Sequence, residues 1–200
     1  MSEQADKAFP LTLTDIEVGS RLVEALIQHA TSSSGSPIAY EDLLTLGRGM
    51  YPRHTMLGRE VVAGIGMKLS FVEAFCKANG YPNLACLAVN KDTMQPGAGR
   101  REAWDAERRA VASFDWSAAL ANLADYAAKA QAAVPKRFKP RKERPADVAW
   151  YAYFCSHREA CAQLTSDDKK EIINLLMAGL DPDTALDRVS VAKAELGAVS

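Results

Sequence analysis

The sequence lacks a long apolar run. No stretch approaches the roughly 20 consecutive apolar residues that a membrane-spanning helix needs, so no membrane partner is expected. The N-terminal residues, MSEQADKAF, contain neither the basic segment nor the apolar segment of a secretory signal. A cytoplasmic location is therefore the expectation.

An excess of charge of one sign is also missing. The 24 Lys and Arg residues nearly balance the 25 Asp and Glu residues, and the formal net charge is -1. The global field thus neither requires nor excludes a polyanionic partner, and local clusters of charge must decide. Hydrophobic residues make up 48% of the chain, and 200 residues suffice for one large domain or for one domain with a helical appendage.

Cysteine pairs of the CxxC type are absent. Cys155, His157 and Cys161 form the pattern C-x-H-x3-C, which resembles a metal-ligand spacing. On a helix, however, residues two apart point about 200° away from each other, so Cys155 and His157 diverge. We expect no metal, no structural disulfide in a reducing compartment, and no cofactor.

A catalytic constellation is missing as well. The chain has neither a phosphate-cradling G-x-x-x-x-G-K loop nor a nucleophile-elbow pattern around serine. Its acidic pairs are explained more simply by helix capping and by surface positions; they are Asp105 with Glu107, Asp167 with Asp168, and Asp181 with Asp183. The sequence therefore predicts a protein that is not an enzyme.

The most informative stretch present runs from Ile38 to Gly99. Ile38–Tyr40 predicts a short edge strand, and the next helix is expected to stop at Gly47. Two more helical pieces, to about Ala63 and then from Lys68, end at Asn79-Gly80, which is a C-terminal stop signal. A compact apolar run, Leu84–Asn90, predicts a strand, and a Pro-Gly-Ala-Gly bend follows it. This order of helices, strand and tip is typical of a winged helix-turn-helix.

The remaining segments are predicted to be helical. We expect a first helix from a capping box at Thr14 and Glu17 to about His29, with a polar connector after it. Further helices are expected over 102–113, 116–133 with Asp115 as cap, 147–164, 165–178 with Thr165 as cap, and from Asp181-Pro182 onward. The predicted fold class is mainly α, with a winged helix-turn-helix core, a small β-sheet and a helical C-terminal extension.

A sharp change of composition suggests the domain organisation. Pro135–Pro145 reads PKRFKPRKERP, with six Lys or Arg residues and three prolines among its eleven residues. Such a segment favours an extended, solvated linker. We therefore divide the chain into a helical and winged-helix domain over 1–134, a basic linker over 135–145 and a C-terminal helical subdomain over 146–200.

Two motifs resemble known winged-helix families. Tyr40-Glu-Asp-Leu43 and the segment 84–99 resemble the winged helix of alkylguanine-DNA alkyltransferases and their inactive relatives. Asn79-Gly80-x-Pro82, followed by Leu-Ala-Val-Asn-Lys-Asp over 87–92 and Pro-Gly at 96–97, resembles an uncharacterised bacterial and phage winged-helix family. The transferases carry a Pro-Cys-His-Arg motif where this chain has Pro-Asn-Leu-Ala, at 82–85. The resemblance implies the shape and its use on nucleic acid, without alkyl transfer.

Basic residues supply the candidate nucleic-acid interface, with duplex DNA as the expected partner. A winged helix places one helix in a groove and a basic wing against the backbone, and each neutralised phosphate releases counterions. The candidates around the recognition element, on the wing and in the linker are Arg53, His54, Arg59, Lys68, Lys91, Arg100, Arg101, Lys136, Arg137, Lys139, Arg141, Lys142 and Arg144. The alternative is that these charges are solvated faces and a hinge.

An aromatic cluster suggests a different class of function. Aromatic residues are enriched in the cores of protein interfaces, and the cluster consists of Trp150, Tyr151, Tyr153 and Phe154. It is compatible with a phage or plasmid protein that binds and inhibits a host defence or repair enzyme. Burial of the same aromatics against the last two helices is the alternative.

Overall fold

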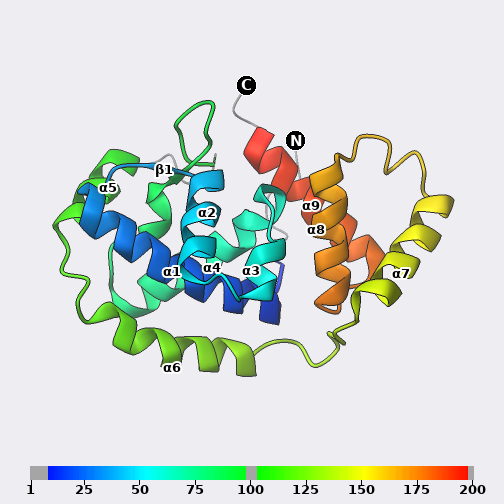
Figure 1. The fold of residues 1–200 in the computed structure, drawn as a ribbon, viewed down its shortest axis with the longest axis horizontal. Helices are drawn as coiled ribbons and strands as arrows, with labels where there is room; N and C mark the ends of the chain where they lie inside the picture. Colours follow the sequence, from blue (N-terminus) through cyan, green and yellow to red (C-terminus); the bar gives the residue numbers. More distant parts are fainter. Residues whose placement is uncertain (1–8, 98–102, 198–200) are drawn as a thin grey trace.

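The computed structural model describes residues 9–97 and 103–197 and confirms that the protein is mainly α-helical (Figure 1). Within these two ranges there are nine α-helices, two short 3-10 helices and one two-stranded sheet. No helix in the described part of the chain is both long and apolar enough to cross a membrane.

Helix α1 (Leu13–Ser33) is the long central helix of the larger lobe (Figure 1). Its capping box is formed by Thr12 and Asp15, so the predicted box at Thr14 is wrong by two residues. The backbone N–H of Thr12 donates to Asp15 Oδ2 at 2.8 Å, and that of Asp15 donates to Thr12 Oγ1 at 3.1 Å. The helix continues beyond His29, because Ser33 bonds back to a helical carbonyl and Ser34 then takes a left-handed conformation.

The predicted breaks after α1 are only partly correct. Helix α2 (Tyr40–Met50) continues through Gly47, and α3 (Thr55–Arg59) and the 3-10 helix η1 (Val62–Gly64) follow it. Helix α4 (Ile65–Asn79) begins three residues before the predicted start. The predicted stop at Gly80 is confirmed, since this residue has a φ of 69° and its N–H bonds back to the last helical turn.

The sheet is small, as predicted, but it is shorter and differently built. Strand β1 (Ile38–Ala39) pairs in parallel with β2 (Ala88–Val89). The first four residues of the predicted strand instead form the 3-10 helix η2 (Leu84–Leu87), whose turn is capped by the Asn83 side chain. All four are buried, so burial rather than strand pairing explains their apolar character.

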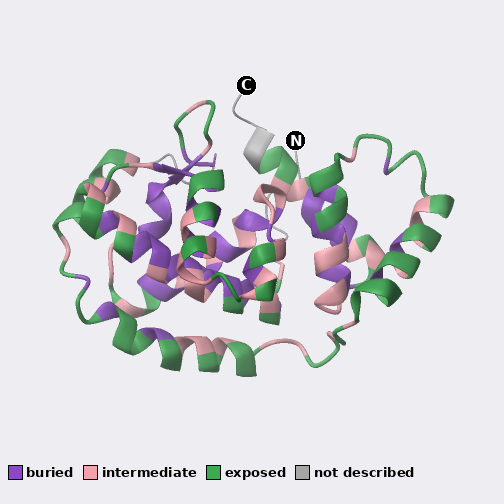
Figure 2. Cartoon of the chain, viewed as in Figure 1, coloured by how far each residue is buried: buried purple, intermediate pink, exposed green. Residues whose placement is uncertain are grey.

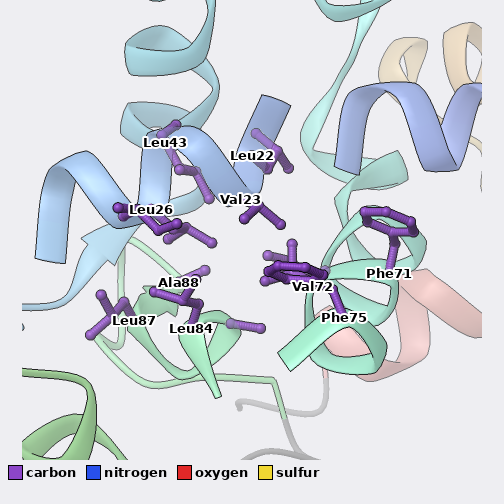
Figure 3. Packing of buried hydrophobic residues seen from close by; sticks show 14 of the residues in the cluster. Leu22, Val23, Leu26, Leu43, Phe71, Val72, Phe75, Leu84, Leu87 and Ala88 are labelled. Carbon is purple, nitrogen blue, oxygen red and sulfur yellow. The ribbon is translucent and has the colours of Figure 1, made fainter. Parts of the chain in front are cut away.

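The core of the larger lobe lies between α1, α4 and η2. Figure 3 shows Leu22, Val23 and Leu26 of α1 facing Val72 and Phe75 of α4. None of these five side chains is exposed to solvent. Burying an aliphatic or aromatic side chain of this size contributes about 1.5–3 kcal/mol, so this contact accounts for much of the stability of the lobe.

Helices α5 (Trp104–Ser113) and α6 (Ala119–Ala132) cover this core. The indole N–H of Trp116 donates to the Val111 carbonyl at 3.0 Å, and this bond fixes the turn between the two helices. Asp115 accepts the N–H of Ser117 in that turn, before the helix begins, so its predicted role as the cap of α6 is wrong.

The C-terminal lobe consists of α7 (Glu143–Ser156), α8 (Ser166–Met177) and α9 (Pro182–Gly197). The predicted cap at Thr165 is confirmed, and it forms a full capping box with Asp168. The predicted start at Pro182 is also confirmed. Helix α7 ends at Ser156 and not at 164, and turns follow it over 158–163.

The buried hydrophobic residues form two separate clusters. One extends from α1 to α6, and the other from α7 to α9. Figure 2 shows these buried segments in the two lobes, with the exposed turns of α6 below the larger one. The predicted linker lies between the two clusters in the sequence, although its last three residues belong to the first turn of α7.

Candidate nucleic-acid interface

The basic segment between α6 and α7 is held against the C-terminal lobe, in contrast to the solvated linker that its composition predicts. We call residues 136–144 the basic connector. The backbone N–H of Arg141 donates to the Met177 carbonyl at 2.8 Å, and its guanidinium Nη1 donates to the Leu180 carbonyl at 2.8 Å. Phe138 packs on the second hydrophobic cluster. The connector therefore has a defined course on the surface.

A glycine in the turn between α8 and α9 makes this course possible. Gly179 has a φ of 103°, and a Cβ at this position would lie 2.5 Å from the backbone nitrogen of Lys139. Only a residue without a side chain fits both conditions. The turn and the connector are thus matched to each other.

Five cations of the basic connector project into solvent. Arg141 is half-buried by its contacts with the lobe, whereas the other five are exposed: Lys136, Arg137, Lys139, Lys142 and Arg144. None of these five makes an ion pair within 4.0 Å in the described part of the chain. The Arg137 guanidinium lies over the Phe138 ring at 5.6 Å from its centroid. The connector is therefore a row of accessible positive charge.

The predicted recognition residues do not form one surface with free cations. Arg53 is exposed in the turn before α3, whereas His54 is half-buried and accepts the N–H of Leu57 as the cap of that helix. Arg59 is already engaged by Glu143 at 3.0 Å and by the Asn174 amide oxygen at 3.3 Å. Since Glu143 opens α7, this pair links Arg59 to the end of the basic connector.

The wing candidates lie after β2. Lys91 is exposed in a loop that the Asn90 N–H closes with the Gln95 carbonyl at 2.9 Å. The other two candidates, Arg100 and Arg101, lie outside the described residues.

Lys68 is the clear correction among the predicted phosphate contacts. Its side chain is buried, and its Nζ lies 3.0 Å from Glu60, 3.2 Å from Glu171 and 3.4 Å from Asp15. Burial alone would lower the pKa of Lys68, but the three carboxylates raise that pKa above its usual value. The ammonium therefore stays charged inside the protein and cannot reach a phosphate.

Lys68 belongs to a buried charge cluster that joins the two lobes. We use this name for Asp15 of α1, Glu60 after α3, Lys68 of α4, Glu171 of α8 and Arg188 of α9. Arg188 Nη2 lies 2.6 Å from Asp15 Oδ1. Burial raises the pKa of the Asp15 carboxyl, but Arg188 and Lys68 outweigh this effect and hold it at about 2.

Glu60 is the carboxyl of the cluster that burial affects most visibly. Burial raises its pKa to about 8; the Lys68 charge opposes this rise, whereas Glu171 and Asp15 add to it. Gly64 lets the two glutamates approach, because a Cβ there would lie 2.4 Å from atoms of both. Three carboxylates face two cations, so one proton on Glu60 makes the cluster neutral.

The predicted aromatic partner surface is mostly part of the fold. Trp150 is buried, and Phe154 packs on the same cluster of α7, α8 and α9. The Tyr153 hydroxyl donates to Asp183 at 2.9 Å, and burial and this carboxylate raise the pKa of Tyr153 to about 12. Tyr151 is different, since 69% of it is exposed.

A groove of about 490 Å³ lies between α1 and α6. The Arg21 guanidinium lies 2.6 Å from Glu24 and 4.7 Å from the Tyr51 ring centroid, and the Tyr51 hydroxyl donates to Glu24. Arg21, Glu24 and Tyr51 thus contact one another, and the opposite wall, formed by α6, is apolar apart from Gln131. Its lining also includes Ser20, whose hydroxyl donates to the Ile16 carbonyl, and His54, whose Nδ1 accepts the Leu57 N–H.

Metal-binding groups are not assembled in the described part of the chain. Within 9–97 and 103–197, no three His, Cys, Asp or Glu side chains are placed to hold an ion. Cys161 is buried while Cys155 is exposed, so the two cysteines of the C-x-H-x3-C pattern lie in different environments. His157 instead stacks on the Tyr153 ring, with 4.0 Å between ring centroids.

No protein-family model, no curated protein and no solved structure matches this chain.

Proposed function

We propose that this protein binds nucleic acid without catalysing a reaction, and that the basic connector is its main phosphate-binding surface. One observation carries the proposal: five exposed Lys and Arg side chains without ion pairs to the described residues lie along a segment that the fold holds in place. Each phosphate that such a side chain neutralises releases condensed counterions, which favours binding. Because Arg141 anchors the connector, less chain entropy is lost on binding than for a free linker.

The winged-helix interpretation supports a secondary contact. In this interpretation, which stays a prediction, the Asn90–Gln95 loop with the exposed Lys91 corresponds to the wing, although β1 and β2 form a parallel pair and η2 replaces most of the predicted strand. Helix α4 presents only one exposed basic residue, Lys77, because most of its faces are packed. We therefore assign phosphate contacts to the loop and the connector and none to a recognition helix.

The proposal is tested by the salt dependence of binding. Fluorescence anisotropy with labelled duplex and single-stranded oligonucleotides is measured from about 50 to 300 mM salt, because log affinity falls linearly with log salt and the slope reports the number of phosphate contacts. The variant carries Lys136→Gln, Arg137→Gln, Lys139→Gln and Lys142→Gln. We expect its slope of log affinity against log salt to fall by about 3 to 4 on duplex, at roughly 0.9 for each lost contact.

A matched control removes the same charge elsewhere. Lys77, Arg109, Lys129 and Lys169 are also exposed, and their replacement by Gln changes the net charge equally. The control variant is expected to keep most of the wild-type slope. Equal losses in the two variants would reduce the effect to net charge, and no binding by the wild type at low salt would refute the proposal.

A protein partner is the second candidate function, in the form of a phage or plasmid factor that blocks a host enzyme. The observation that favours it is the exposure of Val148 and Tyr151, two large apolar side chains on one helix. An interface built on them would respond little to salt, in contrast to binding by the connector.

A further inference from the structure

Helix α7 carries an exposed stripe that begins in the basic connector. Arg144, Val148, Tyr151 and Cys155 are spaced by four, three and four residues, so they share one face of the helix. We call this face the α7 stripe. All four are exposed, Val148 to 62% and Tyr151 to 69%. The opposite face buries Ala146 and Trp150 against α8 and α9.

The fold itself makes no use of the Tyr151 side chain. Its hydroxyl has no hydrogen bond, and its ring has no ring partner, among the described residues. Tyr153, two residues later, is in contrast fixed by Asp183 and His157. An unpartnered aromatic ring next to free cations is the combination that single-stranded nucleic acid recognises, since bases stack on the ring and phosphates bind the cations.

We propose that the α7 stripe binds single-stranded nucleic acid, with one base stacked on Tyr151 and the adjoining phosphates on Arg144 and Lys142. This inference rests on the proposed function and specifies its ligand. Seven residues of helix place Arg144 and Tyr151 about 10 Å apart along the axis, so a strand of a few nucleotides covers both.

A single strand fits this surface better than a duplex does. In a duplex the faces of the bases are already stacked inside the helix, so an exposed ring on a convex helix face meets only the sugar–phosphate backbone. Two carboxylates lie beside the stripe: Glu143 is paired with Arg59, whereas Asp147 is exposed one turn before Tyr151. The Asp147 carboxylate weakens a phosphate contact beside the ring, and its removal is expected to strengthen binding.

The test uses the full chain with a 12-nucleotide thymidine strand and a hairpin duplex of equal charge as probes. Tyr151→Leu keeps an apolar side chain but removes the aromatic face, and Tyr151→Phe keeps that face. We expect Tyr151→Leu to lose about tenfold in affinity for the single strand with an unchanged salt slope. Tyr151→Phe should bind as the wild type does, and Asp147→Asn should bind more tightly. Since Tyr151 is exposed, all three variants should melt at the wild-type temperature.

Cys155 provides a second readout at the stripe itself. It is the one exposed cysteine of the four, because Cys76, Cys86 and Cys161 are buried. Alkylation of Cys155 by a maleimide should slow when the thymidine strand saturates the protein, and the duplex should protect it less. Equal protection by both probes would overturn the inference.

Failure of this inference is distinguishable from failure of the proposed function. If Tyr151→Leu binds the single strand as the wild type does while the connector variant loses its salt slope, nucleic-acid binding stands and stacking is overturned. Equal losses on strand and duplex also overturn it. If neither probe binds, but an acidic peptide protects Cys155, the stripe is a protein-docking face and both proposals fall.

Discussion

At the scale of single residues, the buried charge cluster shows how burial and neighbouring charges compete. An ion taken from water into a protein interior loses several kcal/mol of hydration, which near neighbours must offset. Asp15 has two cations close by, Arg188 at 2.6 Å and Lys68 at 3.4 Å. Among the described residues, Glu60 pairs with Lys68 alone, and it shares this cation with Glu171 and Asp15. The difference explains why burial raises the pKa of Glu60, whereas the pKa of Asp15 falls.

Stability should depend on pH through Glu60. The pKa of Glu60 rises from 4.5 to about 8 on folding, so the folded state holds a proton that the unfolded chain releases between these values. The free energy of unfolding should therefore be highest below about pH 4.5 as far as Glu60 is concerned. It should decrease by about 1.4 kcal/mol per pH unit up to about pH 8. Chemical denaturation across this range measures it.

The variant Glu60→Gln isolates this pH dependence of stability, because a glutamine amide does not titrate between pH 4.5 and about 8. The difference in unfolding free energy between wild type and Glu60→Gln should vary with pH from 4.5 to about 8. The same change at the exposed Glu17, Glu17→Gln, is the control. Asp15 acts in another window: its pKa is lowered, so its contribution is lost only as the pH falls from 3.8 toward about 2. A pH-independent difference for Glu60→Gln would mean that this carboxyl is ionised in the folded protein.

At the scale of elements, local signals were predictable and distant partners were not. The stop at Gly80 and the start at Pro182 depend on backbone preferences of one residue, and the cap at Thr165 depends on Asp168, three residues away. The sequence therefore predicts them. The predicted box at Thr14 is wrong because two capping patterns overlap here, Thr12 with Asp15 and Thr14 with Glu17. The helix uses the first of them, in which Asp15 is buried.

The candidate site followed the same rule. The basic composition of 135–145 predicted accessible charge, but its anchoring depends on Met177 and Leu180, which are far away in the sequence. Lys68 lies on the helix face of Phe71, Val72 and Phe75, and this position indicated burial. Its partner Glu171 is 103 residues distant, however, so no local pattern identifies it.

The prediction for an element concerns the turn that receives the connector. Gly179→Ala puts a Cβ 2.5 Å from the Lys139 backbone at a φ of 103°. Strain and displacement together should cost about 2–4 kcal/mol in unfolding free energy, measured by urea denaturation. Trypsin cleavage within the connector should become faster, because the backbone of Lys139 must move away.

Gly66→Ala is the matched control for this prediction. Gly66 lies in α4, and a Cβ added there would meet no other atom within 4 Å, so alanine should stabilise the helix by about 0.5–1 kcal/mol. The same chemical change thus has opposite expected signs at the two glycines. Stabilisation by Gly179→Ala would show that the connector does not rest on this turn.

At the scale of the whole molecule, two hydrophobic clusters are joined by one set of buried charges. Asp15 lies in the first turn of the central helix, and Arg188 lies 173 residues later in the last helix. Glu171 of α8 meets Lys68 of α4 across the same boundary. A lobe separated from its neighbour would leave these ions without partners, so we expect the two lobes to unfold together although each has its own core.

The last prediction breaks that link from one side. Arg188→Met leaves Asp15 buried with only Lys68 near it, and removal of one partner from a buried ion pair costs about 3–5 kcal/mol. The loss should loosen α8 and α9 first, and hydrogen exchange should show their amides exchanging faster than those of α1.

The exposed control Arg158→Met should change neither stability nor exchange. Adding Asp15→Asn to Arg188→Met should recover part of the loss, because the two residues interact directly and their effects are not additive. Strictly additive losses would instead show that the lobes are held by apolar packing and that the buried pair contributes nothing to their coupling.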